Sequence, residues 1–131
     1  IKMKIIGNGV DIVDNFRIKK AIKNKKFINR LFTNEEIKSS LKKNINRPNY
    51  FAKRFAAKEA FVKAIGTGFS KNINFKDINI KNNPYGKPEI YVNTKLMKII
   101  KKKFKISKFK SYLSLTDEKN HSISFVIISG S

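Results

Sequence analysis

Several charged residues that could bind a metal or a phosphate fall within residues 54–68, which read RFAAKEAFVKAIGTG. Far upstream, Asp11 is a lone carboxylate within the apolar sequence Gly-Val-Asp-Ile-Val. Burying a carboxylate is costly unless it is paired or binds a metal. If Asp11 lies on a strand beneath a helix that carries Glu59, the two carboxylates can share one Mg²⁺, leaving its other positions to water and phosphate oxygens.

The cations of the same stretch would suit a phosphate-bearing ligand. Arg54, Lys58 and Lys63 are expected on the helix that carries Glu59, where they could neutralise a diphosphate. The sequence Gly66-Thr67-Gly68 follows this helix directly, and the backbone N–H groups of such a turn could bind an anion.

Each of these features also has a simpler explanation. Glu59 and Lys63 have the i, i+4 spacing of an ordinary surface ion pair, which contributes a few tenths of a kcal/mol. Asp11 could cap the helix that follows its strand, although Asp14 is better placed for that role. A Gly-Thr-Gly turn commonly only ends a helix. The presence of both carboxylates is what favours a metal site.

The elements that must position the site can be predicted from local patterns. Residues 4–13 are expected to form a strand, with a bulge or a close backbone approach at Gly7-Asn8-Gly9. Asp14 suits the N-cap of a helix over residues 15–24. Thr33 and Glu36 have the spacing of a capping box at the start of another helix.

The helix that carries Glu59 should begin near Pro48, which suits a first turn, and end at Gly66. Four alanines at intervals of four would form a thin stripe that allows this helix to approach a sheet closely: Ala52, Ala56, Ala60 and Ala64.

Alternating apolar residues predict a strand region over residues 73–80, a turn at 82–86 and a return strand at 89–92. Residues 94–103 are expected to be helical, and strands at 112–116 and 122–128 should flank a hairpin turn. The predicted fold class is α+β, with helices packed on a mainly antiparallel sheet, in a single domain over residues 1–131.

The composition narrows the function classes. The formal net charge is +21, from 30 Lys and Arg against 9 Asp and Glu, so anionic partners should be attracted. Compositional drift on a solvated surface explains the many lysines equally well. No apolar run approaches the length of a membrane span, no cysteine is present and there is one histidine. We expect a cytoplasmic protein that does not bind a membrane.

Taken together, these motifs resemble the holo-(acyl-carrier-protein) synthases, the small bacterial 4′-phosphopantetheinyl transferases. Sequences that carry the resemblance are Gly-Val-Asp-Ile-Val around Asp11, with Arg17 six residues later, and Arg-Phe-Ala-Ala-Lys-Glu-Ala before Lys63 and Gly66-Thr67-Gly68. The Gly-Lys-Pro turn at residues 86–88 and the Ser-Leu-Thr-Asp sequence at 114–117 also match in order. The resemblance covers nearly the whole chain.

The resemblance implies Mg²⁺-dependent transfer of phosphopantetheine from coenzyme A to a serine of apo acyl carrier protein, with release of adenosine 3′,5′-bisphosphate. Asp11 and Glu59 would be the metal ligands, and Lys63 would contact the phosphate under attack. Arg17 and Arg30 would dock the acidic carrier protein. Further residues would hold coenzyme A, some of them from a neighbouring subunit of a trimer: Arg54, Lys58, Gly66, Thr67 and Gly68.

Two points stay open at this level. Many members of the family have a histidine at the position of Tyr112, and a tyrosine cannot supply a cation there near neutral pH. Either Glu59 or a metal-bound water could accept the proton of the serine.

Two other functions compete with this interpretation. One is a small basic nucleic-acid-binding protein, which would leave Asp11 and Glu59 unexplained because anions repel phosphate. The other is a catalytically inactive relative that serves as an interaction module.

Overall fold

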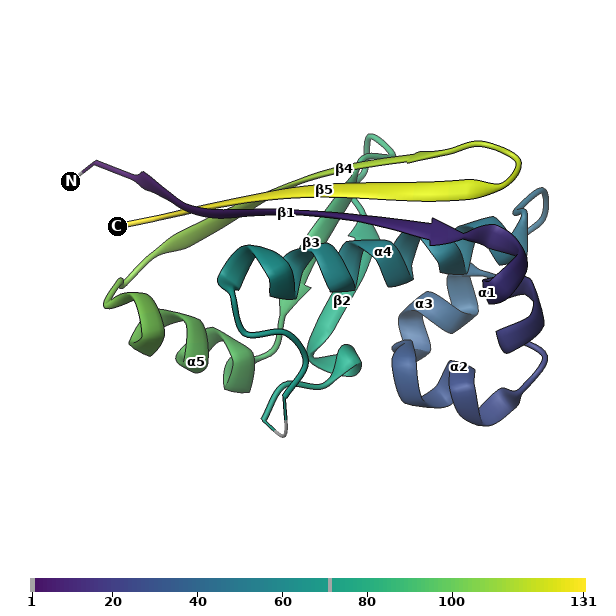
Figure 1. The fold of residues 1–131 in the computed structure, drawn as a ribbon, viewed down its shortest axis with the longest axis horizontal. Coiled ribbons are helices and arrows are strands. Elements are labelled where there is room, and N and C mark those ends of the chain that lie inside the picture. Colours follow the sequence, from purple (N-terminus) through teal and green to yellow (C-terminus); the bar gives the residue numbers. More distant parts are fainter. Residues whose placement is uncertain (1, 71) are drawn as a thin grey trace.

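One long helix, α4 (Arg47–Ile65), packs along one face of a three-stranded antiparallel sheet in the computed structural model, which describes residues 2–70 and 72–131 (Figure 1). The Asn46 side chain caps the helix by accepting a hydrogen bond from the Asn49 N–H, and Pro48 lies in the first turn. Gly66 ends the helix with a φ of 77°, a left-handed conformation that glycine adopts without strain. The predicted start near Pro48 and end at Gly66 are both confirmed.

The sheet has the order β1 (Lys4–Asp14), β5 (His121–Gly130) and β4 (Phe109–Asp117). Both possibilities considered for its first strand occur. The β1–β5 register shifts between Ile5 and Gly7, as in a bulge. A Cβ atom on Gly7 or Gly9 would clash with the Ala64 or Ala60 carbonyl oxygen of α4. Because Gly7 and Gly9 have no side chains and face alanines of α4, the backbones of β1 and α4 can lie in direct contact.

Three short helices cover the beginning of α4: α1 (Asn15–Ala21), α2 (Lys25–Leu31) and α3 (Asn34–Ser39). The helix expected over residues 15–24 ends at Ala21. Asn24 is instead the N-cap of α2, where its side chain accepts a hydrogen bond from the Lys26 N–H. The helix α2 was not predicted. The capping box of Thr33 and Glu36 is confirmed at the start of α3. These helices share an apolar cluster with the first half of α4.

On the far side of α4 lie the hairpin β2 (Ile78–Asn82) and β3 (Pro88–Val92) and the helix α5 (Thr94–Phe104). The strand expected over residues 73–80 begins only at Ile78. Phe75–Asp77 is instead the 3₁₀ turn η1, because Asp77 accepts a hydrogen bond from the Asn74 N–H and closes the chain into a turn. The second half of α4 joins these elements and the sheet in a second apolar cluster.

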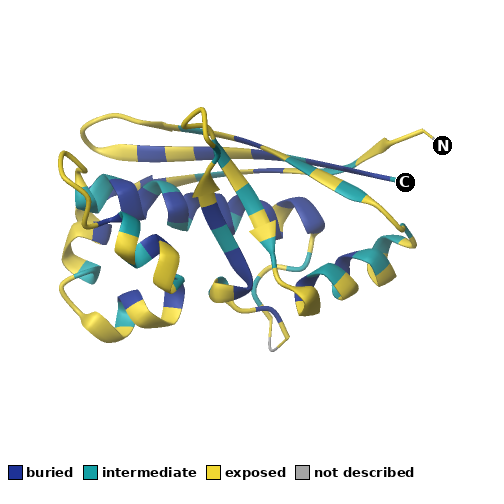
Figure 2. Cartoon of the chain, turned by 180° about the vertical axis from the view of Figure 1, so that it is seen from behind, coloured by how far each residue is buried: buried dark blue, intermediate teal, exposed yellow. Residues whose placement is uncertain are grey.

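Burial along the strands alternates, as expected for a sheet with one face on the core (Figure 2). Val126 and Ile128 of β5 are buried against α4, whereas Ile123 and Phe125 are exposed on the other face. No helix among residues 2–70 and 72–131 is long and apolar enough to cross a membrane. The α+β class with helices on antiparallel strands is confirmed.

Candidate functional site

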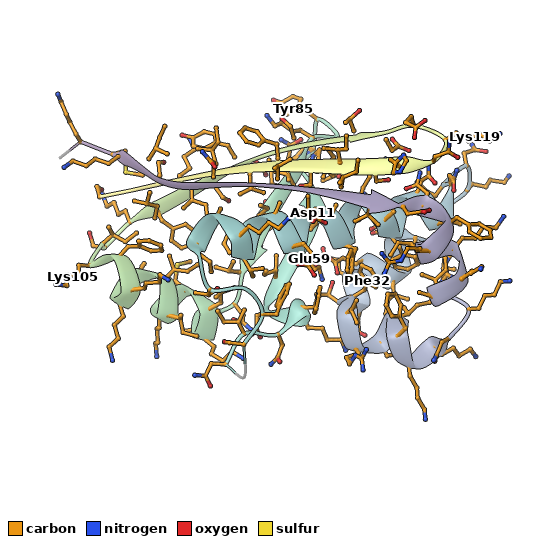
Figure 3. All side chains as sticks on the ribbon, in the orientation of Figure 1. Asp11, Phe32, Glu59, Tyr85, Lys105 and Lys119 are labelled. Atoms are coloured by element: carbon orange, nitrogen blue, oxygen red, sulfur yellow. The ribbon has the colours of Figure 1, made fainter. Side chains whose placement is uncertain are left out.

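Asp11 and Glu59 face each other from β1 and α4, as Figure 3 shows. Alternation along β1 places Asp11 on the same side as Gly9 and Val13, which are buried against the helix. Glu59 is partly buried. Burial raises the pKa of Glu59, and the negative charge of Asp11 raises it further, whereas the nearby Lys63 lowers it. The predicted meeting of the two carboxylates is therefore present in the fold.

Lys63 reaches from α4 across to β1. Its ammonium donates hydrogen bonds to the Asp11 carboxylate, at 3.1 Å, and to the Val10 carbonyl oxygen, at 3.0 Å. Lys63 thus does not form a simple surface ion pair with Glu59 along one helix. Its ammonium instead pairs with the carboxylate of Asp11, which lies 52 residues earlier in the sequence.

The two carboxylates line a pocket of about 310 Å³ between β1, α1, α2 and α4. Arg17, expected from the resemblance to dock a partner, lines this pocket together with Phe27 and Phe55. Those two aromatic residues also line a neighbouring groove of about 490 Å³, to which Arg30 belongs. Arg17 therefore lines the pocket of the two carboxylates, and Arg30 lines the adjoining groove. Phe27 was not singled out from the sequence.

Lys58 does not reach the pocket. Its side chain is completely buried, and its ammonium donates to Glu36 at 2.7 Å and to the Leu31 carbonyl oxygen at 2.8 Å. Burial lowers the pKa of Lys58, and the Glu36 carboxylate opposes this shift. The expected contact of Lys58 with coenzyme A does not fit this placement, because no part of its side chain is exposed to solvent. Lys58 instead ties α3 and the end of α2 to α4.

Glu36 has more partners than its predicted capping role requires. Its two carboxylate oxygens accept hydrogen bonds from the Thr33 N–H, the Lys58 ammonium and the Ile80 N–H of β2. The capping box could be recognised in the sequence, but nothing there indicated that the same carboxylate would bridge three elements.

Arg54 lies apart from the carboxylates, in a pocket of about 200 Å³ that shares no lining residue with the pocket of Asp11 and Glu59. Its guanidinium stacks over the Tyr50 ring at 3.8 Å and donates to Asn82 at 3.3 Å. Arg54 is 6% exposed, and its Nε has no hydrogen-bond partner among the described residues. Lys42 and Lys81 line the same pocket.

The amides of the Gly66-Thr67-Gly68 turn are already used. The Gly66 N–H donates to the Lys63 carbonyl oxygen, and the Thr67 and Gly68 N–H groups donate to that of Val62. These bonds satisfy carbonyls at the end of α4, where the helix dipole is negative. The anion-binding role expected for these amides is therefore not supported.

Tyr112 extends from β4 on the face of the sheet opposite α4, and it is 48% exposed with the Lys110 ammonium 5.3 Å from its ring centre. Within one chain, this face lies across the sheet from Asp11. The residue that replaces the family histidine is thus not part of the carboxylate pocket of its own chain.

The residues present fit a hard divalent cation rather than zinc. Carboxylate oxygens are the ligands that Mg²⁺ prefers, and it keeps several positions for water and phosphate. Among the described residues there is no group of three or more His, Cys, Asp or Glu side chains that could enclose a metal. Two carboxylates at an open pocket match the ligand pattern of Mg²⁺.

Comparisons with known proteins identify the family of the chain. The model of the 4′-phosphopantetheinyl transferase superfamily matches residues 7–126. A holo-(acyl-carrier-protein) synthase of Pelagibacter ubique is 55% identical over 126 residues, which cover 96% of this chain and 98% of that protein.

Two solved structures have similar folds. The holo-(acyl-carrier-protein) synthase of Neisseria meningitidis has a TM-score of 0.84 and 38% identity, and the match covers 95% of this chain and 98% of that one. That of Bacillus anthracis, in complex with CoA (3′,5′-ADP), has a TM-score of 0.79 and 32% identity over 99% of this chain and 100% of that one. The chain belongs to the 4′-phosphopantetheinyl transferase superfamily.

Proposed function

We propose that this protein is a holo-(acyl-carrier-protein) synthase that transfers 4′-phosphopantetheine from coenzyme A to a serine of apo acyl carrier protein. The observation that carries the proposal is the meeting of Asp11 and Glu59 at one pocket, with the Lys63 ammonium hydrogen-bonded to Asp11, in a fold shared with enzymes of that name. The reaction forms a bond from the serine oxygen to phosphorus and breaks a bond within the diphosphate. Adenosine 3′,5′-bisphosphate leaves.

Phosphoryl transfer depends mainly on positioning and on stabilising charge, so the site needs cations and one proton acceptor. Asp11 and Glu59 would hold Mg²⁺, which supplies positive charge to the diphosphate. Lys63 would contact the phosphate under attack. Either the Glu59 carboxylate or a water molecule would accept the proton of the serine.

For coenzyme A we propose two further contacts. Arg54 has a buried guanidinium whose Nε has no hydrogen-bond partner among the described residues, and its pocket also contains Lys42. Lys81 and Glu35 line the same pocket as an ion pair at 3.3 Å, so Arg54 and Lys42 would supply the net positive charge that suits a phosphate group. The turn that follows α4 would contribute through the Thr67 hydroxyl, which would exchange its hydrogen bond to the Gly68 carbonyl oxygen for one to the ligand, because the backbone amides of the turn are bonded within the helix end.

The carrier protein would dock over α1 and α2. Arg17 and Arg30 supply positive charge beside the pocket and its neighbouring groove, and Phe27 and Phe55 supply apolar surface that is continuous between them. An acidic protein with an apolar contact residue would match both features.

We also propose a homotrimer built on the outer face of the sheet. Exposed apolar side chains gather there from neighbouring positions of β1 and β5, with Val10 beside Phe125 and Ile12 beside Ile123. A continuous apolar sheet face is a poor surface to leave in water, and contacts with copies of the chain would cover it. We treat residues 1–131 as one domain and retain a cytoplasmic location as an expectation.

The test is mass spectrometry of apo carrier protein incubated with this protein, coenzyme A and Mg²⁺. We expect the mass of the carrier to rise by one phosphopantetheine group, and excess chelator to prevent the change. Modification at full rate in chelator would refute the metal assignment. No modification under any metal condition would leave an inactive relative or the nucleic-acid-binding alternative.

A further inference from the structure

The Asp11 carboxylate already carries a cation from its own chain. The Lys63 ammonium lies 3.1 Å from the Asp11 Oδ1 atom. It donates a second hydrogen bond to the Val10 carbonyl oxygen, at 3.0 Å. The Asp11 side chain is 16% exposed and that of Lys63 is 54% exposed. Lys63 therefore approaches the carboxylate from the solvent side.

The same ammonium is also close in sequence to the second carboxylate, because Lys63 lies one turn after Glu59 on α4. Its positive charge thus offsets the repulsion between the two acids in the protein alone. Any divalent ion that binds Asp11 must compete with this ammonium, because two cations near one carboxylate repel each other.

We propose that Lys63 is an internal counter-ion that weakens metal binding until coenzyme A arrives, and that the diphosphate draws Lys63 away from Asp11 and so strengthens metal binding. This inference rests on the proposed function, and it adds a mutual dependence of the two ligands. Lysine suits the role because its flexible stem lets the ammonium move between partners. When coenzyme A binds, its diphosphate replaces Asp11 as the partner of the Lys63 ammonium.

The dependence has a measurable consequence. Coupling between two ligands is reciprocal, so coenzyme A should tighten metal binding by the same factor as metal tightens coenzyme A binding. An ion pair with this exposure contributes up to about 1 kcal/mol, equivalent to about a fivefold change in affinity. Removal of the Lys63 charge should tighten metal binding to the free protein by up to that factor.

The experiment uses Mn²⁺ as the probe and follows its free concentration by electron paramagnetic resonance. Wild type, Lys63→Met and Lys53→Met are titrated with and without coenzyme A, and a titration of coenzyme A alone corrects for metal bound by the free ligand. Lys53 is the matched control, because it lies on the same helix but pairs with Asp117 at 3.4 Å. Circular dichroism confirms that the variants are folded.

We expect Lys63→Met to bind Mn²⁺ about threefold to fivefold more tightly than wild type without coenzyme A. Coenzyme A should then tighten Mn²⁺ binding less in Lys63→Met than in wild type, and Lys53→Met should match wild type. Equal affinity of free Lys63→Met and free wild type, or an unchanged coupling factor, would refute the inference and leave the proposed function intact. An absence of Mn²⁺ binding in all three proteins would instead refute the proposed metal site itself.

Discussion

Lys58 and Glu59 are adjacent in α4, yet their side chains have opposite environments. Lys58 is completely buried against Glu36, whereas Glu59 opens into the pocket with Asp11. Successive helix residues point about 100° apart, so one of the two faces the small helices and the other faces the strand. The pair therefore joins a buried structural contact to the proposed metal site at a single point of the helix.

The buried pair should matter for stability. Lys58→Met leaves the Glu36 carboxylate without its buried cation, and removing one member of a buried pair costs about 3–5 kcal/mol. Urea denaturation at fixed protein concentration would show this loss, with Lys53→Met as the control, because Lys53 forms a partly exposed ion pair with Asp117. A loss below about 1 kcal/mol would mean that Glu36 is satisfied by the Thr33 and Ile80 amides alone.

The two carboxylates should matter for turnover. Asp11→Asn and Glu59→Gln should each lower the rate of carrier modification by a hundredfold or more, about 3 kcal/mol in the barrier, with the fold retained. Lys38→Ala on α3 should have no effect, because Lys38 is exposed and lies outside both pockets. Near-normal turnover of either carboxylate variant would make that residue structural.

The raised pKa of Glu59 predicts a pH dependence of stability. The folded protein keeps the Glu59 proton to higher pH than the unfolded chain, whose ordinary value is 4.5. Above pH 4.5 the unfolded state therefore binds fewer protons than the folded state. The free energy of unfolding falls as pH rises from 4.5 to the raised pKa of Glu59 in the folded protein. Without metal, Glu59→Gln should gain stability relative to wild type between pH 4 and pH 7. A constant difference would argue that Glu59 is not perturbed.

Assembly should depend on the outer face of the sheet. Phe125→Asp places a charge among Val10 and its neighbours and should reduce the mass measured by light scattering from that of a trimer to that of a monomer. Tyr85→Asp is the control, because Tyr85 is 95% exposed in the turn between β2 and β3. A wild-type protein that is already monomeric and active would overturn the trimer.

Docking of the carrier should be sensitive to salt. The Debye length falls from about 10 Å at 0.1 M to about 3 Å at 1 M, so salt should raise the KM for carrier protein more than that for the enclosed coenzyme A. Arg30→Glu should reproduce the effect at low salt, as should Arg17→Glu. Lys102→Glu is the control, because it lies on α5 at the opposite end of the molecule from α1 and α2 (Figure 1).

If both substrates respond equally to salt, or if Arg30→Glu behaves like Lys102→Glu, the positive charge is a general property of the surface and not a docking face. Steady-state kinetics with each substrate varied in turn would distinguish these results.

Local signals were sufficient for much of the fold. Pro48 and Gly66 marked the ends of α4, Thr33 and Glu36 marked the start of α3, and the turn before His121 placed the last hairpin. These features depend on residues close in sequence, since caps and turns satisfy backbone groups within a few positions. The boundary between α1 and α2 was missed because Asn24 resembles any other polar residue of that segment.

Two parts of the site depended on different information. The sequence by itself determined that Asp11 needs a partner and that the alanine stripe allows helix and strand to approach closely, so that Asp11 and Glu59 meet if that strand lies beneath the helix. The amides of Gly66-Thr67-Gly68 donate to Val62 and Lys63, only a few residues away, as in the simple helix end that the sequence also allowed. Only the tertiary structure decided that Lys58 is enclosed with Glu36 and that Lys63 binds Asp11. Each of these two outcomes depends on which groups from distant segments reach the side chain, and spacing along the chain does not contain that information.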